Sequence, residues 1–200
     1  TETIRNQECF PQGKQELAVH VHHNGGRDFT MNTLANRLIG SARLDARSYE
    51  EVETDPYATM QAVGIVLLSS LAAAIGTGIR DLSTTLQLVM VALFSWIIWV
   101  LLTLFIGTQL LPERETRADF SQVLRTTGFS ASPGILRIFG IIPGIGWIVF
   151  SIATIWMLFT FVVAVRQALD FTTTGRALAV CLLGWIIYGV LFFGFVRTAL

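Results

Sequence analysis

Long apolar stretches without charge dominate this sequence. The segments from Ala62 to Ile79 and from Leu82 to Leu111 contain no ionisable side chain. A bilayer core is about 30 Å thick and an α-helix rises about 1.5 Å per residue, so roughly 18 or more apolar residues can cross it. The core of a soluble domain does not need charge-free runs of this length. The pattern therefore predicts transmembrane helices.

Turn and capping signals divide the apolar part into about five predicted membrane segments. Asp55-Pro56 places an acidic N-cap and a first-turn proline before the first helix, and Pro112 ends the second. The third begins at Ser132-Pro133 and ends at Pro143-Gly144, which as an α-helix covers only about half of the hydrocarbon core. It is a short, tilted or extended crossing, or a re-entrant half-helix. The predicted segments are about 56–79, 85–111, 133–143, 146–168 and 175–196.

The N-terminal 54 residues are polar and contain two predicted parts. In residues 1–30, a polar extension, apolar and polar side chains alternate from Leu17 to His22, and Asn24-Gly25-Gly26 follows, so a small hairpin is predicted. Residues 31–54 have a helical period and predict short amphipathic helices on the cytoplasmic side, which can lie at the membrane surface. Ser48 with Glu51 fits a capping box for one of them. A further surface helix is predicted around Phe120, Val123 and Leu124.

The arginines predict an orientation. With five crossings and a cytoplasmic N-terminus, eight arginines lie inside: Arg37, Arg43, Arg47, Arg114, Arg117, Arg125, Arg166 and Arg176. Only Arg80 and Arg197 lie outside. This is a strong positive-inside bias. A re-entrant third segment moves Arg166 and Arg176 outside and weakens it, so we expect five crossings, with the N-terminus in and the C-terminus out.

Composition agrees with a membrane protein. Hydrophobic residues make up 52% and charged residues 14%, against about 25% charged residues in soluble domains. The formal net charge is zero, so no global field attracts nucleic acid, and no nucleic-acid partner is expected. The expected fold class is an all-α polytopic helix bundle in the cell (cytoplasmic) membrane, in contact with membrane lipids.

Several motifs from Met31 onward resemble the Yip-domain family of multi-pass membrane proteins, in its bacterial branch. They cover about the last 170 positions, in order: Arg37-Leu38-Ile39-Gly40, Leu44-Asp45, Tyr49-Glu50-Glu51-Val52-Glu53, Asp55-Pro56, Gly128-Phe129-Ser130-Ala131-Ser132-Pro133-Gly134, Ile142-Pro143-Gly144-Ile145-Gly146-Trp147 and Ala164-Val165-Arg166-Gln167-Ala168-Leu169-Asp170-Phe171. The resemblance implies a helical membrane domain of about five segments with a cytoplasmic N-terminus. It implies no catalytic residues. Eukaryotic relatives are linked to Rab-type GTPases and vesicle traffic, a role we do not transfer.

Small residues and tryptophans are the main candidate site residues. Three pairs have the small-x-x-x-small spacing that lets helix backbones approach in lipid: Ala72 with Gly76, Ala74 with Gly78, and Gly140 with Gly144. They predict packing within the bundle or against another membrane protein. Four tryptophans fall near the middle of predicted helices rather than at an interface: Trp96, Trp99, Trp156 and Trp185. Their rings either fill the bundle core or line an apolar cleft for a lipid, quinone or carotenoid-like molecule.

Arg137 and the histidines are weaker candidates. Arg137, in the short third segment, is expected to reach the cytoplasmic surface and a lipid phosphate, or to pair with Asp119 or Asp170. His20 and His22 share one face of the predicted strand and form at most a weak metal site, because no Cys or carboxylate stands at metal spacing. We expect neither a metal nor another cofactor.

Two functions remain. No membrane His or Lys is available to activate Ser95 or Ser151, so an enzyme is not expected. An ion-coupled transporter usually marks its pathway with membrane carboxylates or histidines. The first expected function is a scaffold or accessory subunit that packs against other integral membrane proteins or itself. The alternative is a protein that binds or moves a lipid-like or other apolar ligand.

Overall fold

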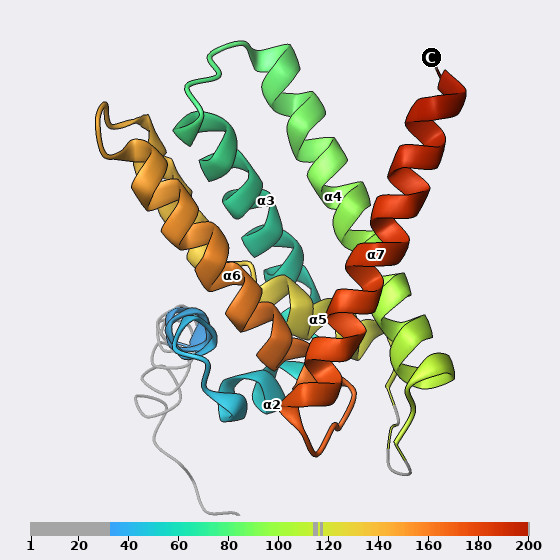
Figure 1. The fold of residues 1–200 in the computed structure, drawn as a ribbon. Coiled ribbons are helices and arrows are strands. Elements are labelled where there is room, and N and C mark those ends of the chain that lie inside the picture. Colours follow the sequence, from blue (N-terminus) through green and yellow to red (C-terminus); the bar gives the residue numbers. More distant parts are fainter. Residues whose placement is uncertain (1–32, 114–115, 117, 200) are drawn as a thin grey trace, which may run out of the picture. The chain divides into compact units, whose positions relative to one another are not determined.

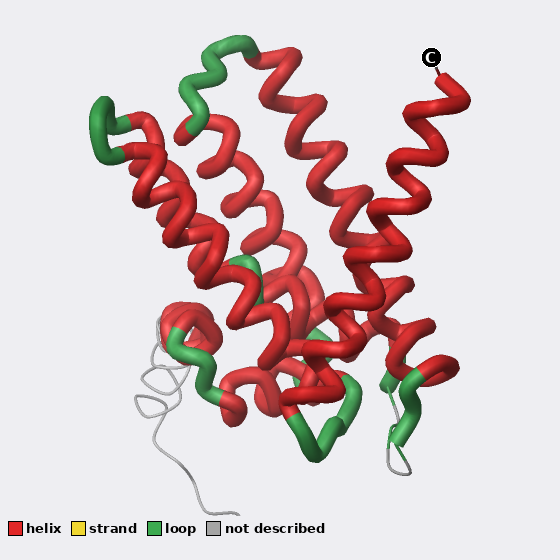
Figure 2. The backbone as a smooth tube through the Cα atoms, viewed as in Figure 1, coloured by secondary structure: helices red, strands yellow, loops and turns green. Residues whose placement is uncertain are grey.

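The structure, a computed structural model, describes residues 33–113, 116 and 118–199 of the chain. Within these residues every regular element is a helix, which confirms the all-α prediction (Figure 2). The chain divides into a unit of residues Thr1–Asn36, helical where described, and a second unit, Arg37–Leu200. The hairpin predicted within residues 1–30, with His20 and His22, lies outside the described residues.

The second unit begins with helical residues 37–42 and continues through eight helical elements among its described residues (Figure 1). These are α2 (Ala46–Thr54), α3 (Ala58–Gly76), α4 (Leu82–Phe105), η1 (Ile106–Leu110), α5 (Phe120–Phe129), η2 (Ser132–Ile141), α6 (Gly146–Ala168) and α7 (Thr174–Ala199). Three helices are long and apolar enough to cross a membrane: Ala58–Gly76, Leu82–Leu110 and Gly146–Ala168. A shorter apolar stretch, Thr174–Val190, belongs to α7.

Helices α2 and α4 begin at other residues than the sequence predicts, because an aspartate caps each of them. Asp45, rather than Ser48, caps α2, and its carboxylate accepts a hydrogen bond from the backbone N–H of Arg47. Asp81 caps α4 and accepts from the N–H of Thr84 at 2.8 Å, so this helix begins at Leu82 instead of about residue 85. A carboxylate there satisfies N–H groups that the first helical turn leaves free.

The third apolar segment is a 3-10 helix, which sequence periodicity did not predict. η2 starts with Pro133 in its first turn and ends at Ile141, just before Pro143. A 3-10 helix rises about 2.0 Å per residue, so ten residues span about 20 Å, instead of about 15 Å in an α-helix. The short segment gains length by this change.

α5 and η2 together follow α3 from one end to the other. A side chain at Gly128 would meet Ala62, one at Gly134 would meet Ser69, and one at Gly140 would meet the backbone of Gly76. Residue numbers at the contacts increase together along both segments, so the segment from Gly128 to Gly140 runs parallel to α3. Contact is close because glycine presents no Cβ at these crossings.

α5 occupies the position predicted for a surface helix, but it is not a surface helix. Asp119 and Gln122 form a complete capping box that starts it. Val123, Arg125 and Phe129 are buried against α2, α3, α4 and α6. The four longest helices of the unit, α3, α4, α6 and α7, run beside these inner elements (Figure 1).

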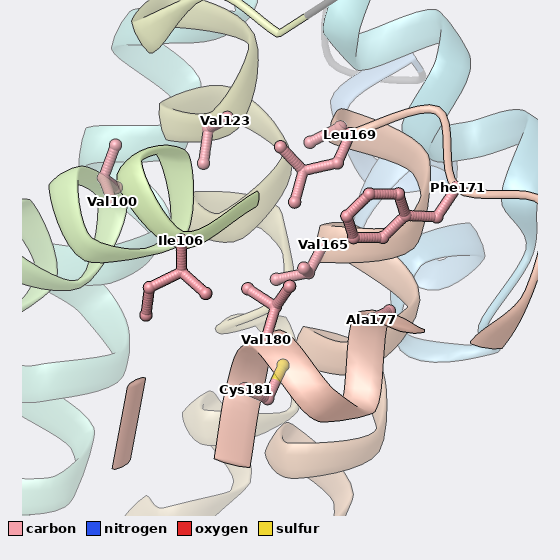
Figure 3. Packing of buried hydrophobic residues seen from close by; sticks show 10 residues of the cluster. Val100, Ile106, Val123, Val165, Leu169, Phe171, Ala177, Val180 and Cys181 are labelled. Carbon is pink, nitrogen blue, oxygen red and sulfur yellow. The ribbon is translucent and has the colours of Figure 1, made fainter. Parts of the chain in front are cut away.

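One apolar cluster holds the second half of α4 to α5, α6 and α7 (Figure 3). Val100 and Ile106 meet Val165 and Val180, and each of these four side chains is almost fully buried. On α4 itself the buried residues are Val100 and Thr103, both in the half that follows Trp96. The half that begins at Leu82 is therefore packed more loosely against its neighbours.

Candidate functional site

A cleft of about 630 Å³ lies beside the middle of α4, where Leu88, Trp96 and Trp99 line it. Its walls come from α3, α4, α6 and α7, with α5, η2 and the short connection between them behind. Along α3 it extends from Val66 to Thr77, about 17 Å of helix. Its size falls within the range of about 300–1,000 Å³ that is typical of ligand pockets.

Trp99 is the centre of an aromatic cluster on one wall of the cleft. Its ring stacks on Tyr188 at a centroid distance of 5.8 Å and meets the edge of Phe161 at 5.9 Å. Trp185 lies 6.0 Å away at a tilted angle. Gly184 permits this arrangement, because a Cβ there would lie 2.7 Å from the Trp99 ring. The cluster joins α4, α6 and α7 and presents large apolar faces to the cleft.

Three of the four tryptophans singled out in the sequence line the cleft, and the fourth does not. Trp96, Trp99 and Trp185 are lining residues. The Trp96 indole N–H donates to the hydroxyl of Thr127 at 3.1 Å. The Trp156 indole N–H instead donates to the backbone carbonyl of Ala42 at 2.7 Å, and this ring is no part of the cleft. Trp156 therefore anchors the segment before α2.

Several hydroxyl groups on the cleft wall donate to carbonyls of their own helices. Ser70 donates to the carbonyl of Val66 at 2.8 Å and Thr154 to that of Phe150 at 2.8 Å. Ser130 donates to the carbonyl of Thr127 at 2.6 Å. A hydroxyl whose proton is engaged in this way offers a ligand only its acceptor lone pairs. The wall is therefore weakly polar.

Arg137 is the one ionisable side chain among the described residues that line the cleft. Its guanidinium lies over the Phe150 ring, 5.2 Å from the centroid, and its buried Nε has no hydrogen-bond partner. The expected pairing with Asp119 or Asp170 is not observed: Asp119 caps α5. Access of Arg137 to the cytoplasmic surface stays a prediction; its carbonyl lies against Gly76, at the far end of α3 from Ala58.

Close backbone contact at the small residues involves three glycines. A Cβ on Gly76 would lie 1.9 Å from the Arg137 carbonyl oxygen, and one on Gly146 would lie 1.9 Å from that of Gly140. Gly78 and Gly144 depart from the expected packing role, since nothing lies within 4 Å of an added Cβ and both have positive φ. They form turns that L side chains rarely adopt. Two further members of these pairs, Ala72 and Ala74, are buried.

A model of the Yip1 domain family matches residues 46–196 of the chain. The chain belongs to the Yip1 domain family. The match extends from the start of α2 into the last turns of α7 and includes every element that lines the cleft. With its long apolar helices, the protein is an integral membrane protein. No curated protein and no solved structure matched the chain.

The Yip1 domain also has a polar pocket of about 390 Å³, made by two of the motifs that carried the family resemblance. Glu50 and Glu53 of α2 face Arg166, Gln167 and Asp170 at the end of α6. Burial, followed by the nearby negative charge of Asp170, raises the pKa of Glu53 to about 7. Glu50 accepts a hydrogen bond from the Gln167 amide at 3.1 Å.

Two further contacts hold this end of the Yip1 domain together. Buried Arg37 pairs with Glu51 at 2.9 Å and with Asp55 at 2.8 Å, and this contact with Arg37 lowers the pKa of Asp55 against the opposing effect of burial. The Tyr49 hydroxyl donates to the carbonyl of Ser41 at 3.1 Å and lies 3.3 Å from that of Thr160. Burial raises the pKa of Tyr49. The Arg37 pairs tie the segment before α2 to α2 and to Asp55 at its end, and the Tyr49 hydroxyl ties α2 to α6.

Sequence reasoning missed several cleft residues of the Yip1 domain. Phe161 lines the cleft, and Tyr188, although it does not line the cleft, stacks on Trp99. Both sit within apolar segments, where an aromatic residue has no distinguishing neighbour in the sequence. Thr127 directly precedes the motif Gly128–Gly134, which carried the family resemblance, and this position in the sequence could have marked it as a candidate site residue. Among the described residues no group of three or more His, Cys, Asp or Glu side chains is placed to hold a metal ion.

Proposed function

We propose that this Yip1 domain protein is a non-enzymatic membrane protein that binds a lipid-like molecule in the cleft beside Trp99. The observation that supports this most strongly is the cleft itself. It combines about 630 Å³ of space with three tryptophan rings and hydroxyls that are already hydrogen-bonded. Such a surface gains most from covering an apolar body.

The small residues favour this proposal over a scaffold. Their expected use in a scaffold is contact with another membrane protein. Gly76, Gly140 and Gly146 are instead in contact with backbone atoms of the same chain, between α3, η2 and α6. Small residues were the strongest argument for an external partner, and these glycines are already packed against other helices of the same bundle.

We further propose five crossings with a cytoplasmic N-terminus, in the cell membrane of a bacterium. The parallel course of Gly128–Gly140 along α3 supports a third crossing. α2, the start of α5 and the α6–α7 connection then share one side, opposite the α3–α4 connection (Figure 1). Arg37, Arg125 and Arg166 belong to the first side, and Arg80 to the second, as positive-inside orientation requires.

A scaffold or accessory role is the second candidate. An exposed apolar stripe follows one face of α4 at helical spacing: Leu86, Met90, Phe94, Ile97, Leu101 and Phe105. A transmembrane helix of another protein, or of a second copy, can pack along such a face, and so can lipid tails. None of these six side chains lines the cleft.

Native mass spectrometry after extraction in mild detergent separates the two functions. Lipid-like binding predicts a monomer with one tightly held molecule of lipid mass, and loss of that molecule when Trp99 and Trp185 are both changed to Ala. A stoichiometric protein partner or a dimer without bound lipid would contradict the proposal and support the scaffold. Leu86→Ala and Phe94→Ala, on the exposed stripe, are the control variants and are expected to retain the bound molecule.

A further inference from the structure

Arg137 differs from the other arginines that the structure shows at least partly buried. Arg37 pairs with two carboxylates, Arg125 donates to the carbonyl of Glu53, and Arg166 donates to the carbonyls of Phe171 and Thr172. Arg137 has no oxygen partner among the described residues, and its Nε is buried. Among the described residues, its guanidinium makes a cation–π contact with the Phe150 ring.

A guanidinium in this position favours an anion as its partner. Arginine within the hydrocarbon region is costly unless it is paired or reaches water. A cation–π contact recovers only part of that cost. The remaining donors of the Arg137 fork are matched best by two oxygens of one phosphate, because such a pair forms two parallel charge-assisted hydrogen bonds.

The position of Arg137 along the bundle fits a lipid headgroup. It precedes Ile141, the end of η2, by four residues, or about 8 Å of 3-10 helix. Beside it, the cleft runs along α3 from Thr77 back to Val66, about 17 Å. One leaflet of a bilayer core is about 15 Å deep, half of about 30 Å. A lipid whose phosphate lies at Arg137 thus has space for one acyl chain alongside Trp99.

We infer that the cleft binds an anionic phospholipid, with the phosphate on Arg137 and one acyl chain along Trp96, Trp99 and Trp185. The inference rests on the proposed function and names the ligand class. The lipid comes from the leaflet that faces the α3–α4 connection, because Arg137 lies at that end of α3. A zwitterionic lipid carries its own cation beside the phosphate, and that cation competes with Arg137 for the phosphate.

The test compares two lipids with identical chains, dioleoylphosphatidylglycerol and dioleoylphosphatidylcholine, titrated into delipidated protein in neutral detergent. The wild type is expected to bind phosphatidylglycerol at least about tenfold more tightly, the size of one hydrogen bond to a charged group. Arg137→Gln is expected to abolish this preference. Arg80→Gln, an exposed arginine at the same end of α3 and outside the cleft, is the matched control and is expected to retain it.

The outcomes are distinct. Equal wild-type binding of both lipids, or an unchanged preference in Arg137→Gln, would overturn this inference and leave the lipid-binding function in place. No binding of either lipid would overturn both. Glycerol 3-phosphate that binds as tightly as phosphatidylglycerol would mean a site for a soluble anion and would overturn the lipid assignment. If Arg137→Gln does not fold, Arg137→Lys decides, with weakened phosphatidylglycerol binding expected and unchanged binding contradicting the bidentate contact.

Discussion

Glu53 holds a proton at a pH at which an ordinary glutamate is ionised. Its side chain is nearly buried in α2, and burial together with the charge of Asp170 raises its pKa to about 7. The ordinary value is 4.5. Between these values the folded protein keeps the proton while the unfolded chain loses it. Folding is therefore less favourable as the pH rises from about 4.5 to about 7, and the loss levels off above that range.

Glu53→Gln is expected to remove this part of the pH dependence, because an amide has no proton to lose. The variant should melt close to the wild type at pH 5 and at a higher temperature than the wild type at pH 8, in thermal unfolding experiments in detergent. Asp170→Asn should move the wild-type decline to lower pH, because its negative charge no longer opposes ionisation of Glu53. Parallel melting curves for wild type and Glu53→Gln across this range would contradict the assignment.

For individual residues, the sequence predicts which side chains carry chemistry better than it predicts what those side chains contact. Arg137 and the three tryptophans of the cleft are recognisable from the sequence, because large rings and a charge are unusual within apolar segments. The exclusion of Trp156 from the cleft is not recognisable, since its indole partner, the Ala42 carbonyl, lies 114 positions away in the sequence. A backbone carbonyl also has no sequence signature.

Elements were predicted well where capping or proline signals are local. The predicted fourth segment coincides with α6, Gly146–Ala168, and Pro112 ends the second as expected. The 3-10 form of η2 was not predictable from periodicity, because ten residues between two prolines fit either helix type. Tertiary contact with the glycines of α3 and α6 favours the longer, thinner helix.

Two glycines on α3 provide a matched test of this packing. Gly76→Ala is expected to lower the stability of the protein by at least about 1–3 kcal/mol, because its Cβ would lie 1.9 Å from a backbone oxygen of η2 that cannot move alone. Gly64→Ala, on the same helix with nothing within 4 Å of its Cβ, should be neutral or slightly stabilising. Thermal unfolding in detergent measures both. Equal effects of the two substitutions would mean that the contact between α3 and η2 is not formed.

The proposed orientation of the chain can be tested by an accessibility experiment. In a background with Cys9 and Cys181 changed to Ser, Ser83→Cys should react with a membrane-impermeant maleimide in intact cells. Thr173→Cys, in the α6–α7 connection, should react only after permeabilisation. The α3–α4 connection, next to Ser83, and the α6–α7 connection, which contains Thr173, lie at opposite ends of the helices (Figure 1). Labelling of Thr173→Cys in intact cells would contradict that arrangement.

The cleft itself was beyond sequence reasoning, although its tryptophans were not. Apolar periodicity shows which segments are helices, but it does not show that α4 and η1 pack through Val100 and Ile106 while α4 borders a cleft at Leu88. The shape of the cleft depends on the sizes of side chains on six elements at once. The sequence therefore permits both core packing and ligand binding for the same rings.

Photocrosslinking can show whether a lipid occupies this cleft. A phosphatidylglycerol analogue with a diazirine near the end of one acyl chain is incorporated with the protein into vesicles, irradiated, and its attachment sites are mapped by peptide sequencing. Attachment is expected to concentrate on cleft residues such as Met157, Trp96 and Trp99. Attachment spread along the exposed stripe of α4, at Leu86, Met90 and Phe94, with none in the cleft, would contradict it.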